Sequence, residues 1–131
     1  MPLWTFKVYC LEGGACPIRD WYIMQEIEVQ AAFDATLITL AATEDWEDTK
    51  HFKALRREHE GLGEIRFALE KPFIRRFRPV GIWPPVIDRE FIFLLGCEKS
   101  RGVYDPDGAF DLALHYKHQL EAGIGELHEY R

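Results

Sequence analysis

The feature that most constrains the fold is a set of three extended runs that follow one another in the middle of the chain. They cover residues 62–69, 73–80 and 90–97, and each contains the branched apolar and aromatic residues typical of strands. Lys71-Pro72 supplies a turn between the first two, so the sequence predicts a hairpin followed by a third antiparallel strand. The third run is almost wholly apolar, which is typical of a central strand covered on both faces.

Helical patterns flank this central segment. After an opening strand near residues 4–9, the stretch from Pro17 to about Ala42 contains no further proline or glycine. Its apolar residues recur at helical spacing and predict one long, half-buried helix. These residues are Met24, Ile27, Ala31, Ala35, Ile38 and Ala42.

Shorter elements are predicted from capping and breaking residues. Asp48 or Thr49 can cap a short basic helix that ends before Gly61. Three prolines in 79–85 lack the amide donor and predict an exposed loop. Asp105-Pro106 predicts the start of a last helix that ends near Gly123, and the tail 124–131 is expected to be frayed.

Together these patterns predict an α+β fold. We expect a small antiparallel sheet of about four strands, packed on one long N-terminal helix pair and followed by a C-terminal helix. A chain of 131 residues is in the usual size range of one domain, so residues 1–131 are expected to form a single domain.

The charge is unevenly distributed along the chain. The whole chain carries a net charge of −6, but residues 50–101 contain 12 basic and 7 acidic side chains, whereas residues 1–49 contain 2 and 9. A basic middle between acidic flanks is expected if one face meets phosphates. Mixed surface charge without a ligand is the alternative.

Cysteine spacing and hydropathy bear on the compartment. Cys10, Cys16 and Cys97 form an odd set without C-x-x-C spacing, so we expect buried, reduced thiols rather than a disulfide or a zinc site. No apolar run is long enough to span a bilayer, and residues 1–9 do not resemble a signal peptide. The sequence therefore predicts a cytoplasmic protein without a membrane segment.

The central strands resemble a known family in three short motifs. Leu62-Gly63-Glu64-Ile65-Arg66-Phe67 and Phe73-Ile74-Arg75-Arg76-Phe77-Arg78 are similar to two consecutive strands of RelE/HigB toxins. The segment 94–104, with its glycine, basic cluster and Val-Tyr, resembles the end of their next strand. The resemblance is to the RelE/ParE superfamily, and within it to HigB-like and phage-derived members.

The resemblance implies a function. Such toxins belong to type II toxin-antitoxin systems and cut mRNA on the ribosome as metal-independent endoribonucleases, without a cofactor. It implies an antitoxin partner, expected to be a small helix-turn-helix protein, and leaves the oligomeric state open. The catalytic residues implied are Arg66, Arg75, Lys99 and Tyr104, and the RNA-binding residues are Lys53, Arg56, Arg57, Arg78 and Arg101.

Several of these assignments have alternatives. Arg66 and Arg75 can instead pair with Glu64 or Glu70, and Tyr104 can be a packing residue. Relatives often have an arginine where this chain has Glu98, which can act as a base or repel a phosphate. That departure favours a ParE-like toxin that binds a protein target such as a topoisomerase. The acidic composition also allows an inactive relative.

His51 and His59 flank the expected basic helix. Either can touch RNA or supply a general base, and either can be an ordinary surface histidine.

Overall fold

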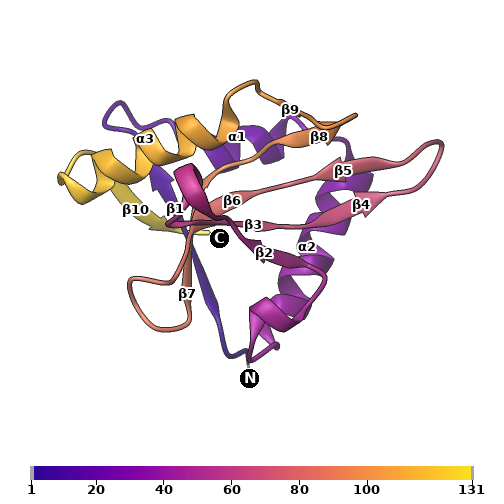
Figure 1. Ribbon diagram of the computed structural model, residues 1–131, viewed down its shortest axis with the longest axis horizontal. Helices are drawn as coiled ribbons and strands as arrows, with labels where there is room; N and C mark the ends of the chain where they lie inside the picture. The colour runs from indigo at the N-terminus through magenta and orange to yellow at the C-terminus, as the bar shows by residue number, and fades with distance from the viewer. Residues whose placement is uncertain (1, 131) are drawn as a thin grey trace.

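The structure is a computed structural model that describes residues 2–130, which form ten strands in two sheets and three α-helices (Figure 1). The six-stranded sheet has the order β10-β1-β7-β6-β3-β2, and the four-stranded sheet has the order β4-β5-β8-β9. The α+β class is as expected. The prediction of a single sheet of about four strands on a long helix pair is wrong. The structure has a six-stranded and a four-stranded sheet, and its first two helices are short.

The strands have the following bounds. The larger sheet contains β1 (Thr5–Cys10), β2 (Phe52–Ala54), β3 (Leu62–Ile65), β6 (Val80–Ile82), β7 (Glu90–Leu95) and β10 (Glu126–Glu129). The smaller sheet contains β4 (Phe67–Leu69), β5 (Arg75–Phe77), β8 (Glu98–Ser100) and β9 (Val103–Asp105).

Three segments of chain pass from one sheet into the other. Residues 62–69 form β3 and then β4, residues 75–82 form β5 and then β6, and residues 90–100 form β7 and then β8. The pairings between neighbouring segments are antiparallel, which confirms the hairpin expected from the sequence. β1 joins β7 in parallel. The two sheets are therefore two halves of one bent set of strands.

The predicted long helix is interrupted. α1 spans Pro17–Ile23 and α2 spans Ile27–Ala41, with Glu26 extended between them. The side-chain amides of Gln25 and Gln30 donate to the carbonyls of Trp21 and Tyr22, which satisfies acceptors at the end of α1. α1 packs on β1 and β7, and α2 packs on β4.

The third helix, α3 (Ala109–Glu121), packs on β3, β6 and β7. Its buried Ala109 and Ala113 belong to a cluster with strand residues of the larger sheet, distinct from the cluster that contains Phe33 and Leu37 of α2. The helices therefore cover opposite faces of the bent strands.

The apolar stripe that predicted the long helix lies on the solvent side of α2. Ile27 is 74% exposed and Ile38 is 73% exposed, whereas Val29, Phe33 and Leu40 are completely buried. The helix is apolar on two sides, so periodicity identified the helix but could not tell which side faces the core.

Three short predictions also fail. The segment near residues 49–60 forms the 3₁₀ turns Trp46–Asp48 and Arg57–His59 with β2 between them, not a basic helix. The expected loop 79–85 contains β6, because its prolines lie on either side of the strand and remove no amide within it. The tail expected to fray forms β10, which pairs with β1 as far as residue 129.

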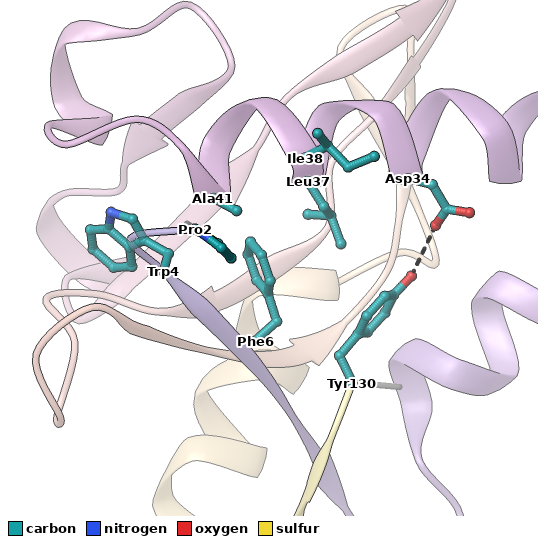
Figure 2. A pocket seen from close by; sticks show the side chains of 8 residues that line it. All are labelled: Pro2, Trp4, Phe6, Asp34, Leu37, Ile38, Ala41 and Tyr130. Carbon is teal, nitrogen blue, oxygen red and sulfur yellow. Dashed lines mark hydrogen bonds between the residues drawn. The ribbon is translucent and has the colours of Figure 1, made fainter.

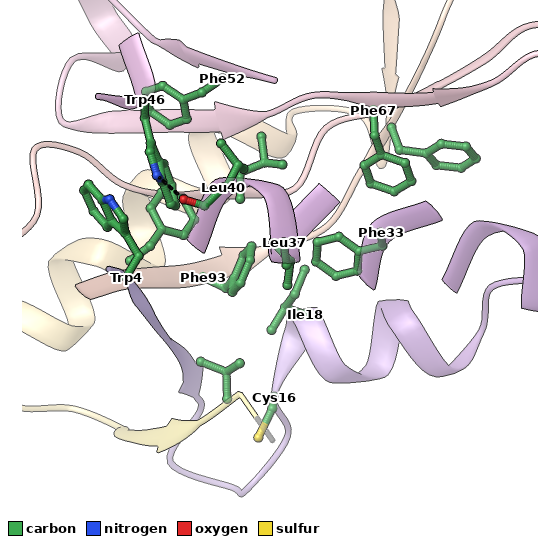
Figure 3. Packing of buried hydrophobic residues seen from close by; sticks show 14 of the residues in the cluster. Trp4, Cys16, Ile18, Phe33, Leu37, Leu40, Trp46, Phe52, Phe67 and Phe93 are labelled. Atoms are coloured by element: carbon green, nitrogen blue, oxygen red, sulfur yellow. Dashed lines mark hydrogen bonds between the residues drawn. The ribbon is translucent and has the colours of Figure 1, made fainter. Parts of the chain in front are cut away.

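Aromatic side chains fill the core between the larger sheet and α2 (Figure 3). The rings of Trp4 and Trp46 stack with centroids 4.3 Å apart, and Trp46 also stacks on Trp83 at 5.7 Å. The indole of the buried Trp46 donates to the Leu40 carbonyl at 2.9 Å, so its polar atom is satisfied. This packing holds the end of α2 against the sheet.

The cysteines differ from expectation in part. A disulfide joins Cys10, at the end of β1, to Cys16, directly before α1, so the prediction of reduced thiols is wrong for this pair. Gly13 and Gly14 form the turn between them. Cys97 is free and buried as expected, and burial raises the pKa of its thiol to about 12.

No helix among residues 2–130 has the length and apolar character needed to cross a membrane.

Candidate functional site

Beyond α3, the strand face on which this helix packs continues into the four-stranded sheet, where its side chains reach the surface. Strand register places Ala68, Arg76, Lys99 and Tyr104 side by side across the four strands. Because side chains alternate between faces, Arg66 and Arg78 extend the same side. We call this surface the open face, and define it by Glu64, Arg66, Arg76, Arg78, Lys99 and Tyr104.

Glu64 lies at the centre of the open face and is only 1% exposed. One carboxylate oxygen accepts from Arg66 Nε at 3.1 Å and lies 3.0 Å from Arg66 Nη2. The other accepts from the Tyr104 hydroxyl at 3.4 Å. A buried carboxylate is costly without a cation and hydrogen bonds, so Glu64 fixes both the guanidinium and the phenol.

Arg78 is held by main-chain carbonyls instead of by a carboxylate. Its Nη1 donates to the Phe77 carbonyl at 2.8 Å, and its buried Nε has no hydrogen-bond partner among the described residues. Desolvation by burial lowers the pKa of Arg78, against the opposing effect of the nearby Glu64. The site therefore contains a partly buried cation whose hydrogen-bonding capacity is not fully used.

Arg76 and Lys99 are direct cross-strand neighbours. Like charges in this position are destabilising, and neither side chain forms an ion pair with any residue of 2–130. Lys99 Nζ lies 5.4 Å from the centroid of the Tyr104 ring, a cation–π geometry. An anion bound between Arg76 and Lys99 would relieve their repulsion.

Tyr104 keeps its proton at neutral pH. Burial, followed by the nearby Glu64 charge, raises the pKa of its phenol to about 12, so the hydroxyl stays protonated at neutral pH. Its ring packs on Phe110 with centroids 4.5 Å apart. Beside it lies a hollow of about 480 Å³, which His59 and Phe110 also line.

His51 lies beside Arg66 at the edge of the open face. Its Nδ1 is 3.2 Å from the Arg66 carbonyl oxygen, and the Arg66 amide donates to the His51 carbonyl at 2.7 Å. Because a carbonyl oxygen only accepts, Nδ1 carries the hydrogen in this contact. In the neutral ring Nε2 is then the acceptor, which is the arrangement a general base needs.

Arg75 is not part of this arrangement. Its guanidinium binds both carboxylate oxygens of Glu98, at 3.0 and 2.9 Å, and Glu26 at 2.8 Å, and it lies over the Phe77 ring. Phe77 packs against Trp21 of α1, so Arg75 and Glu98 lie on the face of the smaller sheet that is opposite the open face. The first two helices cover this face, and we call it the helix-covered face. Glu98 is thus engaged by Arg75 and does not project toward the open face.

The remaining predicted residues are placed around the open face. Lys53 of β2 is paired with Glu64 in register and is exposed on the same side. Arg56 and Arg57 are exposed at the second 3₁₀ turn, which contacts α3, and Arg101 is exposed in the turn between β8 and β9.

Of the sequence-predicted residues, the structure brings together Arg66, Arg78, Lys99 and Tyr104. Sequence reasoning missed Arg76 and the central role of Glu64. A strict two-residue period would have found Arg76, because positions 76 and 78 share a face and positions 75 and 78 do not.

Searches of protein-family models, curated proteins and solved structures found no match to this chain. Among residues 2–130, no group of three or more His, Cys, Asp or Glu side chains is arranged to hold a metal ion.

Proposed function

We propose that the chain is a toxin of the RelE/HigB kind, which binds RNA on the open face and cleaves it without a metal. The observation that carries the proposal is the convergence of Arg66, Arg78, Lys99 and Tyr104 around one buried carboxylate. Guanidinium and ammonium groups on rigid strands stabilise the charge that develops on a phosphate during cleavage.

The reaction assigns a role to each group. Nε2 of His51 accepts the proton of a ribose 2′-hydroxyl, and the 2′-oxygen attacks the adjacent phosphorus. The bond from phosphorus to the 5′-oxygen breaks, and the Tyr104 phenol supplies the proton that the leaving oxygen requires. The products are a 2′,3′-cyclic phosphate and a 5′-hydroxyl. Arg66, Arg76, Arg78 and Lys99 hold the phosphate oxygens.

The hollow beside Tyr104 suits a nucleobase. Its volume of about 480 Å³ is in the range of small-ligand pockets, and Tyr104 and Phe110 line it with aromatic surface. Stacking on aromatic side chains is the usual way in which single-stranded RNA bases are bound. One base in this hollow would place its flanking phosphate near Lys99.

The setting follows from the same proposal. The substrate is mRNA, on the ribosome and therefore in the cytoplasm, and the partner is an antitoxin whose binding covers the open face. The ParE-like alternative rested on Glu98, which stands where relatives have a cation. Glu98 is bound to Arg75 on the helix-covered face, and Arg76 and Lys99 supply cations on the open face, which supports the nuclease proposal over that alternative.

Expression and cleavage experiments test the proposal. Expression of the chain without an antitoxin should arrest growth and produce mRNA fragments that end in 2′,3′-cyclic phosphate. Purified chain that has been treated with EDTA, and then freed of it, should cleave mRNA on ribosomes as fast as untreated chain. Tyr104→Phe keeps the ring contact with Phe110, and His51→Ala removes the base. Each is expected to slow cleavage by about a hundredfold, the usual size of an acid–base contribution.

Arg75→Met is the control variant. It removes an arginine from β5, on the face opposite to that of Arg76. It should cleave at the wild-type rate. Cleavage of an RNA with 2′-deoxyribose at the cut site, or full activity of both Tyr104→Phe and His51→Ala, would show that the proposed chemistry is wrong.

A further inference from the structure

The side of the molecule opposite the open face carries an apolar surface along α2. We call it the α2 stripe, and define it by Ile27, Ala31, Ala35, Ile38 and Ala42, which are all exposed. Ile23 and Met24, at the end of α1, extend it and are 72% and 83% exposed. Contiguous exposed apolar surface of this kind is typical of protein interaction sites.

A groove runs alongside the stripe (Figure 2). It lies between α2 and the start of β1 and has a volume of about 340 Å³. Trp4, Phe6 and Leu37 give it an apolar lining, and Ile38 borders both the groove and the stripe. Stripe and groove together form one surface. A partner's apolar face can lie on the stripe while one of its larger side chains enters the groove.

The shape of this surface favours a helix as its occupant. The stripe repeats every three to four residues and extends for roughly 22 Å, at 1.5 Å per residue. Its central residues, Ala31 and Ala35, are small, so the backbone of a second helix can approach closely. Helices that dock in this way present apolar anchors at the same spacing.

The charge around the surface determines the chemistry of the partner. Residues 17–48, which include the stripe, contain eight carboxylates and one basic side chain, Arg19. Three cations of other elements lie near them: Arg75 and Arg89 are paired with Glu26 and Glu44, and Lys71 lines the same hollow as Glu28. The carboxylates remain in excess. Asp20, Glu28 and Glu47 form no ion pair within the described residues. An acidic rim repels a second copy of the same face and an anionic membrane surface, and it attracts a cationic partner.

We propose that the α2 stripe and its groove are the docking site for an amphipathic helix of another protein, with an apolar face and lysine or arginine on its flanks. The apolar face covers Ile27 to Ile38 and sends one large side chain into the groove. The basic flanks meet carboxylates at the two ends of the stripe, Glu28 beside Ile27 and Glu47 after Ala42. This site is independent of the RNA chemistry proposed for the open face.

The test uses the full chain and a synthetic 18-residue helical peptide with leucine on one face and lysine on the other. Its matched probes replace lysine with glutamate or scramble the sequence at constant composition. Fluorescence anisotropy should give measurable affinity for the lysine peptide alone. Binding should weaken as salt is raised from low to physiological concentration, because the flanking charges are at the surface.

Variants locate the binding. Ile27→Lys with Ile38→Lys places two cations on the stripe at positions that are exposed, so folding should be retained, and it should lower affinity at least about tenfold. Val86→Lys changes an equally exposed residue, 74% accessible, in the loop before β7 and should leave affinity unchanged. Arg76→Glu with Lys99→Glu on the open face should also leave it unchanged.

Three results would overturn the proposal. They are equal binding of the glutamate peptide, equal binding by the double lysine variant, and a dimer of the chain in sedimentation that the double lysine variant abolishes.

Discussion

The segment from Arg75 to Arg78 contains arginines on both faces of the smaller sheet, and their partners differ between the two faces. On the helix-covered face, Arg75 is neutralised by two carboxylates, Glu98 and Glu26. On the open face, Arg76 has no ion pair within the described residues and Arg78 donates to main-chain carbonyls. One arginine completes its bonding by folding, and the others retain capacity for a ligand. The number of arginines therefore says less about binding than the face on which each lies.

The largest effect is expected where the open face depends on a buried charge. Arg66→Met removes the cation that contacts Glu64 and leaves a buried carboxylate with the Tyr104 hydroxyl alone. We expect the free energy of unfolding to fall by about 3 kcal/mol, measured by urea denaturation. Arg66→Met with Glu64→Leu should recover most of this loss. No recovery would mean that the ion pair does not organise the site.

Charge reversal at Arg76 and Lys99 should separate binding from stability. In the double variant Arg76→Glu with Lys99→Glu, RNA affinity should fall about thirtyfold at low salt, because two phosphate contacts become repulsive. The melting temperature should not decrease, since the wild-type pair is already a like-charge pair. Filter binding of a short single-stranded RNA measures the first quantity and calorimetry the second. A parallel loss of both would break the distinction between the two faces.

Arg75→Met should show the opposite behaviour. Its partners are partly exposed, so the loss of unfolding free energy is expected to be small, about 1 kcal/mol after allowing for solvent screening. RNA affinity should be unchanged. A fall in RNA affinity as large as that of the Arg76 and Lys99 reversal would place Arg75 in the site after all.

A separate prediction concerns alkaline pH. The pKa values of Tyr104 and Cys97 are both raised to about 12, and both groups favour their protonated forms in the folded state. The stability that this gives is complete below their unfolded pKa values, near 9 to 10, and is lost as pH rises toward 12. Denaturation at pH 8 and pH 11 should show the decline, and Tyr104→Phe should show less of it.

The sequence identified strands better than it identified their surroundings. The prediction of extended, antiparallel segments was correct for the runs at 62–69, 73–80 and 90–97. Short segments rich in apolar and aromatic residues favour strands, and this preference can be identified from local sequence alone. The division of these runs between two sheets was not predicted, because it depends on long-range packing: α3 packs on β3, β6 and β7 from one side, and α2 packs on β4 from the other.

The helices failed for a related reason. α2 is apolar on its buried side and on its exposed side, so its pattern gives the element but not its orientation. At the site, Arg66, Lys99 and Tyr104, which the sequence assigned to one catalytic group, lie on the open face, whereas Arg75 of the same group lies on the other face. Arg75 pairs with Glu98, a residue 23 positions away in the chain. A local sequence pattern contains no information about a contact of this kind.

The three segments shared by the two sheets have a consequence for how the chain can tolerate change. An added residue in the exposed turn at 70–74 only lengthens the end of the β4–β5 hairpin. The same addition at 78–79, between β5 and β6, shifts the register of one sheet against the other and turns the following side chains to the opposite face. Tolerance to insertion should therefore change abruptly within a few residues, from a permissive turn to a junction where no length variation is compatible with both the core and the basic surface.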